Sequence, residues 1–186
     1  MSSLATLKRG RGWLPQALAI PSPNFDERPA GTAIELLVVH NISLPPGVFG
    51  GPAVGDLFLN SLDCSVHAFF AGLNGLKVSA HFFIRRAGAL VQFVGCEQRA
   101  WHAGQSEWRG RARCNDFSIG VELEGSDHVQ FTDAQYETLT ALLTDLRSRY
   151  PIKAIVGHSD IAPGRKSDPG PFFEWARLAL LNSSQP

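Results

Sequence analysis

Two histidines lie where short apolar segments of the sequence end. His40 follows the run 34–39, and His158 follows the run 153–156. If both runs form parallel strands, the two imidazoles emerge at one edge of a sheet, where α/β folds usually place their sites. Asp168 lies in the loop after His158, and two imidazoles with a carboxylate are an acceptable ligand set for a catalytic Zn²⁺. On spacing alone, a structural hydrogen-bonding role for each histidine remains open.

Glu122 is a candidate general base. It lies on the polar face of the alternating segment 117–123, where an unpaired carboxylate is unfavourable. Near a metal ion, such a carboxylate could take a proton from water and pass it to a leaving amine. The structural alternative is an ion pair with an arginine of the 109–113 loop. Glu124, on the same face, is the weaker candidate.

Lys166 stands two residues before Asp168. A cation there could stabilise the oxyanion of a tetrahedral intermediate beside a metal ion. The alternative is a solvated loop lysine, which is the usual environment of this residue type.

The remaining chemical signals are weaker. Four further histidines occur: His67, His81, His102 and His128. His81 falls within a predicted strand and is expected in the core or behind a metal ligand, whereas His128 is expected in solvent. The sequence contains no GxSxG elbow, P-loop, dinucleotide-binding glycine pattern or HExxH helix, which disfavours those catalytic classes.

The elements that position these groups predict an α/β (α+β) fold. The run 34–39 is typical of a strand buried on both faces. Segments 78–85 and 90–94 are expected to pair as a hairpin, and 117–123 alternates as a further strand. Strands and helices mixed in this order predict a single domain with a central mixed β-sheet flanked by helices.

Helices are expected at three places. The clearest begins after Thr132, which forms a capping-box pattern with Gln135, and it ends before Pro151. A short helix within 54–62 and a final helix over 172–181 are also predicted.

Two long stretches flank these elements. Residues 1–33, rich in Pro, Gly and Arg, are expected to wrap the surface before the first strand, with the domain proper over 34–182. The connection 43–77 is rich in Pro and Gly and is expected to build or cover a site. Whether this segment moves over the site is left open.

The composition disfavours several classes of partner. Hydrophobic residues make up 44% of the chain and charged residues 18%, as in globular proteins. Lys plus Arg equals Asp plus Glu at 17 each, so the basic excess expected of a nucleic-acid-binding protein is absent. No apolar run is long enough to span a membrane, and the run 13–20, interrupted by Pro15 and Gln16, is a poor signal peptide. Three cysteines without metal-site or disulfide spacing, Cys64, Cys96 and Cys114, predict reduced thiols in a cytoplasm.

Five blocks of the sequence resemble the type-2 N-acetylmuramoyl-L-alanine amidases, relatives of phage lysozyme-like amidases and peptidoglycan recognition proteins. In order, they are VVHNIS (38–43), SAHF (79–82), RAWHAG (99–104), NDFSIGVE (115–122) and GHSDIAPGRKSDPGP (157–171). The resemblance extends over nearly the whole chain. Within the family, the sequence is most similar to the bacterial cytoplasmic branch that acts on anhydromuropeptides in cell-wall recycling.

The resemblance implies a site and a reaction. It implies that one Zn²⁺ is bound by His40, His158 and Asp168, that Glu122 is the catalytic carboxylate, and that Lys166 stabilises the oxyanion. The implied reaction is hydrolysis of the amide bond between the lactyl group of (anhydro)-N-acetylmuramic acid and L-alanine, by a water that zinc activates.

The resemblance also implies contacts with the substrate. It places Asn41 and Trp101 beside the sugar and Arg113 at carboxylates of the stem peptide. The branch uses a basic residue before the SAHF block, which here is Lys77, and a lysine lacks the bidentate fork of arginine. The expected partner is a small muropeptide, with no nucleic acid and no membrane, and the protein is expected to be a cytoplasmic monomer.

Two other functions remain open. One is an amidase of intact murein, which the lack of a convincing signal peptide or wall-binding repeat disfavours. The other is a non-catalytic peptidoglycan-fragment-binding module, which would not need the full set of two His, Asp, Glu and Lys. A structural zinc site is less favoured, because such sites usually have four protein ligands.

Overall fold

The protein is built around one mixed sheet. The structure, a computed structural model, describes residues 12–178. Six strands lie in the spatial order β1–β5–β4–β9–β3–β10. Only β4 and β5 pair antiparallel, and the other neighbours are parallel, which confirms the predicted mixed sheet. The strands are β1 (Leu18–Ala19), β3 (Leu36–Ile42), β4 (Phe82–Ile84), β5 (Leu90–Gln92), β9 (Ser118–Glu124) and β10 (Ala154–Gly157).

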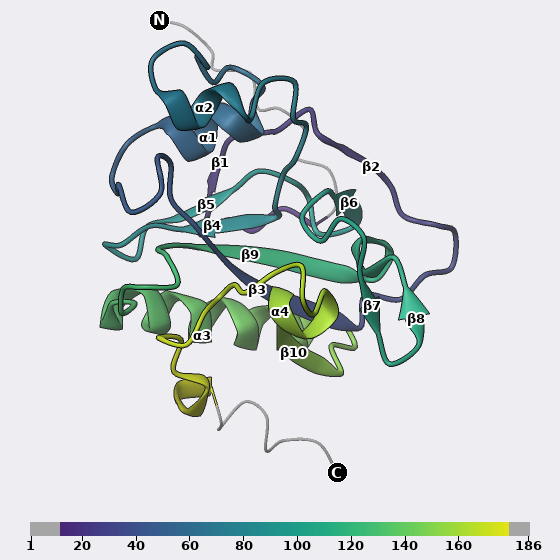
Figure 1. The fold of residues 1–186 in the computed structure, drawn as a ribbon. Coiled ribbons are helices and arrows are strands. Elements are labelled where there is room, and N and C mark those ends of the chain that lie inside the picture. Colours follow the sequence, from purple (N-terminus) through teal and green to yellow (C-terminus); the bar gives the residue numbers. More distant parts are fainter. Residues whose placement is uncertain (1–11, 179–186) are drawn as a thin grey trace, which may run out of the picture.

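Helices cover both faces of the sheet. Figure 1 shows the long helix α3 (Asp133–Arg149) on one side and the short helices α1 (Ala53–Phe58) and α2 (Ala68–Ala71) on the other. The capping box of Thr132 and Gln135 is present as predicted. The apolar face of α3 packs on the sheet through Leu139, Leu142, Leu143 and Leu146.

The alternation predicted for β9 sets the two faces of the sheet. Ile119, Val121 and Leu123 join the core cluster with α3. Glu122 and Glu124 therefore lie on the face that α1 and α2 cover, because successive side chains alternate along a strand. The catalytic candidate is thus directed away from the large core.

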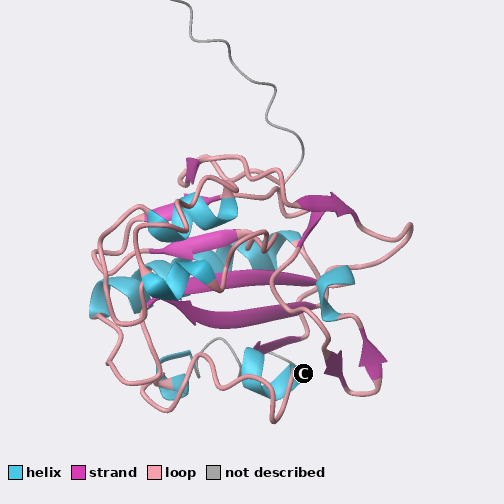
Figure 2. Ribbon diagram, turned by 45° about the horizontal axis from the view of Figure 1, so that its top comes forward, coloured by secondary structure: helices cyan, strands magenta, loops and turns pink. Residues whose placement is uncertain are grey.

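Smaller elements complete the fold. Figure 2 shows the short hairpin of residues 107–112 projecting at one side of the molecule. The pairs are β2 (Phe25–Glu27) with β6 (Gln98–Ala100), and β7 (Glu107–Trp108) with β8 (Arg111–Ala112). Short helices are η1 (Cys114–Asp116), α4 (His158–Ile161) and η2 (Trp175–Leu178).

Several predicted boundaries are wrong. The first predicted strand was placed at 34–39, but β3 continues to Ile42 and contains His40, because pairing with β9 continues through this stretch. In the segment 78–85 only 82–84 is a strand. Residues 78–81 lack a continuous partner strand, because Ser79 N donates to Trp101 O and His81 N donates to Gly120 O. The short helix expected within 54–62 is present as α1, and it begins one residue earlier, at Ala53.

The two ends of the domain also differ from expectation. The final helix predicted over 172–181 is only the 3₁₀ turn Trp175–Leu178, and residues 179–181 lie outside the described part. Residues 12–33 do not merely wrap the surface, because β1 pairs with β5 and Leu14 is buried in the core. Residues 1–11 of that predicted segment lie outside the described part.

The cysteines are unpaired, as predicted. Cys64, Cys96 and Cys114 are all free thiols, and the last two are buried. Among residues 12–178, no helix combines the length and apolarity needed to cross a bilayer.

Candidate metal and catalytic site

Parallel strand pairing gathers the predicted chemical residues at one place. His40 on β3 lies directly opposite Glu122 on β9, and β10, on the other side of β3, delivers His158 at the start of α4. A cavity of about 360 Å³ opens there, and its polar lining includes His40, His102, Glu122, His158, Lys166 and Asp168.

Three side chains converge as a possible metal site. His40 Nδ1, His158 Nδ1 and Asp168 Oδ2 lie 3.0–3.1 Å from one another. All three are largely buried. They form a group whose ligand atoms could hold one metal ion. The structure therefore brings together the three predicted ligands, although His158 and Asp168 lie 118 and 128 positions after His40 in the sequence.

Hydrogen bonding on the far side of the His158 ring supports a metal role. His158 Nε2 lies 3.2 Å from the carbonyl oxygen of Ala103. A carbonyl can only accept, so Nε2 carries a proton, which leaves Nδ1, the atom that faces Asp168, as the nitrogen of this ring that can bind a metal ion. His40 Nε2 lies 3.0 Å from His102 Nδ1, which allows the same arrangement for His40.

The donor set fits zinc. Tetrahedral bonds of roughly 2.0–2.1 Å separate neighbouring ligand atoms by about 3.3 Å, close to the observed spacing of 3.0–3.1 Å. Two imidazoles and one carboxylate leave a fourth position, as in catalytic zinc sites.

Ionisation favours metal binding by these groups. Burial lowers the pKa of His40 to about 4, so its ring is neutral near pH 7. Burial alone would raise the pKa of Asp168, but the contacts with His158 and His40 hold that pKa well below its usual range. Neutral imidazole and ionised carboxylate are the forms that bind a metal ion.

Glu122 has the environment of a proton-transfer group. The residue is 8% exposed, and its Oε2 has no hydrogen-bond partner among the described residues. Burial raises its pKa well above the usual range, and the charge of Asp168 adds to that rise, while Lys166 opposes it. The predicted alternative, an ion pair with the 109–113 loop, is not present within residues 12–178.

Glu124, two residues further along β9, has a different role. Its carboxylate accepts hydrogen bonds from the backbone N–H groups of Gly50 at 2.6 Å and Arg86 at 2.9 Å. Arg85 Nη1 lies 3.8 Å away. Glu124 therefore ties the loop before α1 to the β4–β5 hairpin, which leaves Glu122 as the carboxylate available for chemistry.

The predicted substrate contacts divide into two groups. Asn41 and Trp101 line the cavity, as does Lys166, the residue predicted to stabilise the oxyanion. Lys77 lines a neighbouring cavity of about 250 Å³ instead. Arg113 is 69% exposed at its side chain and pairs with Asp116, so it does not join this site.

The polar groups of Asn41 are partly committed. Its Nδ2 donates to Asp127 Oδ1 at 2.6 Å and to the carbonyl oxygen of Pro169 at 3.0 Å. Both amide hydrogens are thereby used, so the carbonyl oxygen is the group of Asn41 left for a substrate donor.

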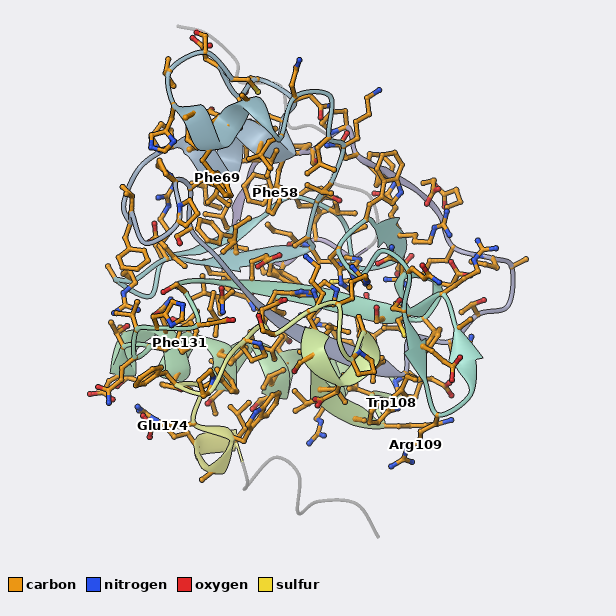
Figure 3. The ribbon with its side chains drawn as sticks, in the orientation of Figure 1. Phe58, Phe69, Trp108, Arg109, Phe131 and Glu174 are labelled. Atoms are coloured by element: carbon orange, nitrogen blue, oxygen red, sulfur yellow. The ribbon has the colours of Figure 1, made fainter. Side chains whose placement is uncertain are left out.

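The connection 43–77, which was expected to build or cover a site, supplies most of an apolar wall of the cavity, although the sequence did not single out the side chains of this wall. The wall consists of Leu57, Phe58, Phe69, Leu73, Leu76 and Val78. In Figure 3, Phe58 and Phe69 lie by the helices α1 and α2, far from Trp108 and Arg109 at the opposite end of the molecule. The feature of the sequence that could have identified these side chains is the presence of large apolar residues in a connection that is rich in turns. Such residues can line a cavity.

Similarity to known proteins agrees with this geometry. The family model described as N-acetylmuramoyl-L-alanine amidase matches residues 30–171. The chain is 55% identical over 172 residues to the 1,6-anhydro-N-acetylmuramyl-L-alanine amidase AmpD of Citrobacter freundii, covering 91% of this chain and 92% of the relative.

Two solved structures extend the similarity to the fold. A crystal structure of a selenomethionine AmpD derivative superposes with a TM-score of 0.90 at 55% identity, covering 92% of this chain and 97% of the other. The AmiD amidase of E. coli, in complex with anhydro-N-acetylmuramic acid-L-Ala-D-γ-Glu-L-Lys, has a TM-score of 0.59 at 34% identity, covering 83% of this chain and 60% of AmiD. With a buried His-His-Asp group beside a free carboxylate, this chain belongs to the N-acetylmuramoyl-L-alanine amidase family.

Proposed function

We propose that the protein is a zinc-dependent amidase of cell-wall recycling. It hydrolyses the amide bond between the lactyl group of (anhydro)-N-acetylmuramic acid and L-alanine in peptidoglycan fragments. The observation that carries this proposal is the convergence of His40, His158 and Asp168 next to Glu122, whose Oε2 has no partner among the described residues. The identity of 55% to an enzyme named for the anhydro substrate supports the choice of substrate.

His40, His158 and Asp168 would hold the ion. When bound, Zn²⁺ supplies a Lewis acid that polarises a carbonyl and lowers the pKa of water to roughly 7. The burial of these ligands excludes bulk water, which strengthens every electrostatic contact in the site.

Glu122 and Lys166 perform the proton and charge steps. Glu122 takes a proton from the attacking water as it adds to the lactyl carbonyl carbon. Lys166, which lines the same cavity, stabilises the negative charge on the carbonyl oxygen. Glu122 then returns the proton to the alanine nitrogen as the C–N bond breaks. A raised pKa suits a carboxyl that must both accept and donate a proton near neutral pH.

The rest of the cavity suits an amphipathic fragment. Asn41 and Trp101 provide a polar amide and an aromatic ring at which the sugar binds. The substrate complex of the E. coli relative, 34% identical, supports a sugar–peptide fragment as the ligand. We further propose that the enzyme works in the cytoplasm, where its three free thiols stay reduced.

The test is release of free peptide from purified anhydromuramoyl-tripeptide, compared with intact murein sacculi. The wild type, Glu122→Gln, and chelator-treated protein with and without added Zn²⁺ are assayed side by side. Zinc-restored cleavage of the fragment that Glu122→Gln abolishes, with little action on sacculi, is the expected result. Preference for sacculi would assign the enzyme to wall lysis, and tight fragment binding without cleavage would make it a recognition module.

A further inference from the structure

His102 occupies a position that the proposed reaction does not use. Its ring lies between His40 and the start of β9. His102 Nδ1 is 3.0 Å from His40 Nε2, and His102 Nε2 is 3.2 Å from Ser118 Oγ. His102 is 9% exposed and is therefore shielded from solvent. The three side chains form a buried hydrogen-bonded chain that ends at a proposed metal ligand.

We propose that His102 and Ser118 are positioning residues that fix the tautomer and orientation of His40. This inference rests on the proposed zinc site. A neutral imidazole carries one N–H, so the proton must lie on Nε2 if Nδ1 is to bind a metal ion. His40 Nε2 can then donate only if His102 Nδ1 accepts. The single ring proton of His102 must in turn lie on Nε2, which donates a hydrogen bond to Ser118 Oγ.

The opposite set of tautomers would block the site. If His102 carried its proton on Nδ1, His40 Nε2 would have to accept it. The proton of His40 would then lie on Nδ1, between the ring and Asp168 Oδ2 at 3.0 Å. The hydroxyl of Ser118 stabilises the productive set because it offers an acceptor to His102 Nε2.

The segment that carries His102 serves both histidine ligands. His102 contacts His40 through its side chain, and the next residue, Ala103, accepts from His158 Nε2 at 3.2 Å. The backbone of this dipeptide is anchored because the N–H groups of His102 and Ala103 donate to Asn115 Oδ1 at 3.2 and 2.9 Å. One dipeptide thus orients both imidazoles.

The neighbouring strand is shaped to admit the His102 ring. A Cβ placed on Gly120 would lie 2.4 Å from His102 Cγ, far inside contact distance. Glycine at this point of β9 is required by the close approach of the ring, since glycine within a strand otherwise weakens it. The strand that presents Glu122 therefore also makes room for the support of His40.

A matched pair of variants separates hydrogen bonding from packing. Leucine and asparagine have nearly the same shape, and only the asparagine amide can accept from His40 Nε2. His102→Leu and His102→Asn therefore disturb the packing equally. Ser118→Ala keeps the His102 ring and removes only its acceptor. Ser106→Ala is the control, because Ser106 is a buried serine whose hydroxyl bonds to Cys114 N and Gly104 O, outside this chain of contacts.

The measurement is the Zn²⁺ dissociation constant, by competition with a chromophoric chelator. Urea unfolding of the metal-free proteins identifies any variant that fails to fold. Loss of a partner behind a metal ligand typically weakens affinity about 10–100-fold, and we expect that for His102→Leu. His102→Asn should recover most of this loss, Ser118→Ala should show a smaller loss, and Ser106→Ala should bind as the wild type does.

Each other outcome overturns the inference. Equal losses for His102→Leu and His102→Asn would make His102 a packing residue only. A Zn²⁺ affinity equal to that of the wild type in His102→Leu or in Ser118→Ala would show that the hydrogen-bonded chain does not contribute to metal binding. A wild type that binds no Zn²⁺ would overturn the proposed metal site and this inference with it, and that result differs from a wild type that binds Zn²⁺ normally while the variants are unaffected.

Discussion

The cavity has two walls of opposite character. The polar wall comes from the ends of three neighbouring strands and carries His40, Glu122 and His158, each less than 10% exposed. The apolar wall comes from α1, α2 and the loops around them, and two of its side chains, Phe69 and Leu76, are 44% and 46% exposed. Figure 1 shows these helices stacked above the sheet, away from α3.

The walls also differ in how they are held. The polar wall is fixed by parallel strand pairing and by side chains that contact one another at 3.0–3.1 Å. The apolar wall is held by packing instead, because Leu57 and Phe58 join the buried cluster that contains Phe83 of the sheet, while its outer side chains stay exposed. The ionisable groups lie on the polar wall and the exposed apolar surface on the other, so variants on the two walls should affect different kinetic constants.

The largest effect is expected on the polar wall. Glu122→Gln keeps the shape of the side chain but removes the proton acceptor, and we expect kcat to fall by about 10²–10⁴-fold. KM for anhydromuramoyl-tripeptide should change little, because Glu122 acts on water and on the leaving nitrogen. Steady-state kinetics checks this. A Glu122→Gln enzyme that keeps its kcat but has a raised KM would place Glu122 among the binding residues and erase the distinction between the walls.

The two glutamates of β9 should have opposite effects on stability. The raised pKa of buried Glu122 means that the folded state holds the proton more tightly than the unfolded state. Stability from this group is therefore fully present below its unfolded pKa and is lost as the pH rises through the raised folded pKa. Glu122→Gln should thus stabilise the metal-free protein more and more as the pH rises above the range in which an ordinary glutamate ionises.

Glu124→Gln should instead destabilise the protein by about 1–3 kcal/mol, because its new amide group faces a backbone N–H that has lost its acceptor. Urea unfolding of both metal-free variants at several pH values makes the measurement. A pH-independent effect of Glu122→Gln would show that Glu122 is not a proton-binding group of the folded state. An unchanged urea midpoint in Glu124→Gln would show that the contacts of Glu124 with Gly50 and Arg86 do not stabilise the protein.

The same contrast explains what the sequence could predict. His40 and His158 could be found because apolar strands that end in polar residues converge at one sheet edge, and Asp168 could be found as the carboxylate in the loop after His158. The capping box of α3 could also be predicted, because it depends on two residues that are three positions apart in the sequence. His102 received no role from the sequence, since its partners His40 and Ser118 are 62 and 16 positions away. The connection 43–77 was expected to build or cover the site, but the side chains of the apolar wall could not be named, because α1 and α2 are short and are fixed by tertiary contacts rather than by periodicity.

A smaller effect is expected on the apolar wall. Phe69→Ala removes an exposed ring that lines the cavity. A loss of about 1–2 kcal/mol of apolar contact would raise KM by roughly 5–30-fold with kcat nearly unchanged. Phe172→Ala is the matched control, because Phe172 is 42% exposed and is not part of the cavity lining. Similar KM values for both variants would show that the substrate does not rest on this wall.

The smallest effect is expected for Lys77, which lies behind the apolar wall. The cavity that Lys77 lines shares Leu57, Leu73 and Leu76 with the cavity that contains His40 and Glu122. Lys77 itself lines only the first of these two cavities. A stem-peptide carboxylate would then interact with the Lys77 ammonium mainly across solvent. Lys77→Ala should therefore raise KM by no more than about threefold, and salt near 0.5 M should abolish that rise. Kinetics on the tripeptide fragment at low and high salt makes the measurement. A rise above tenfold that salt does not remove would mean that the apolar wall rearranges on binding and brings the Lys77 ammonium into direct contact with the peptide. The apolar wall would then supply a charged contact as well as apolar surface.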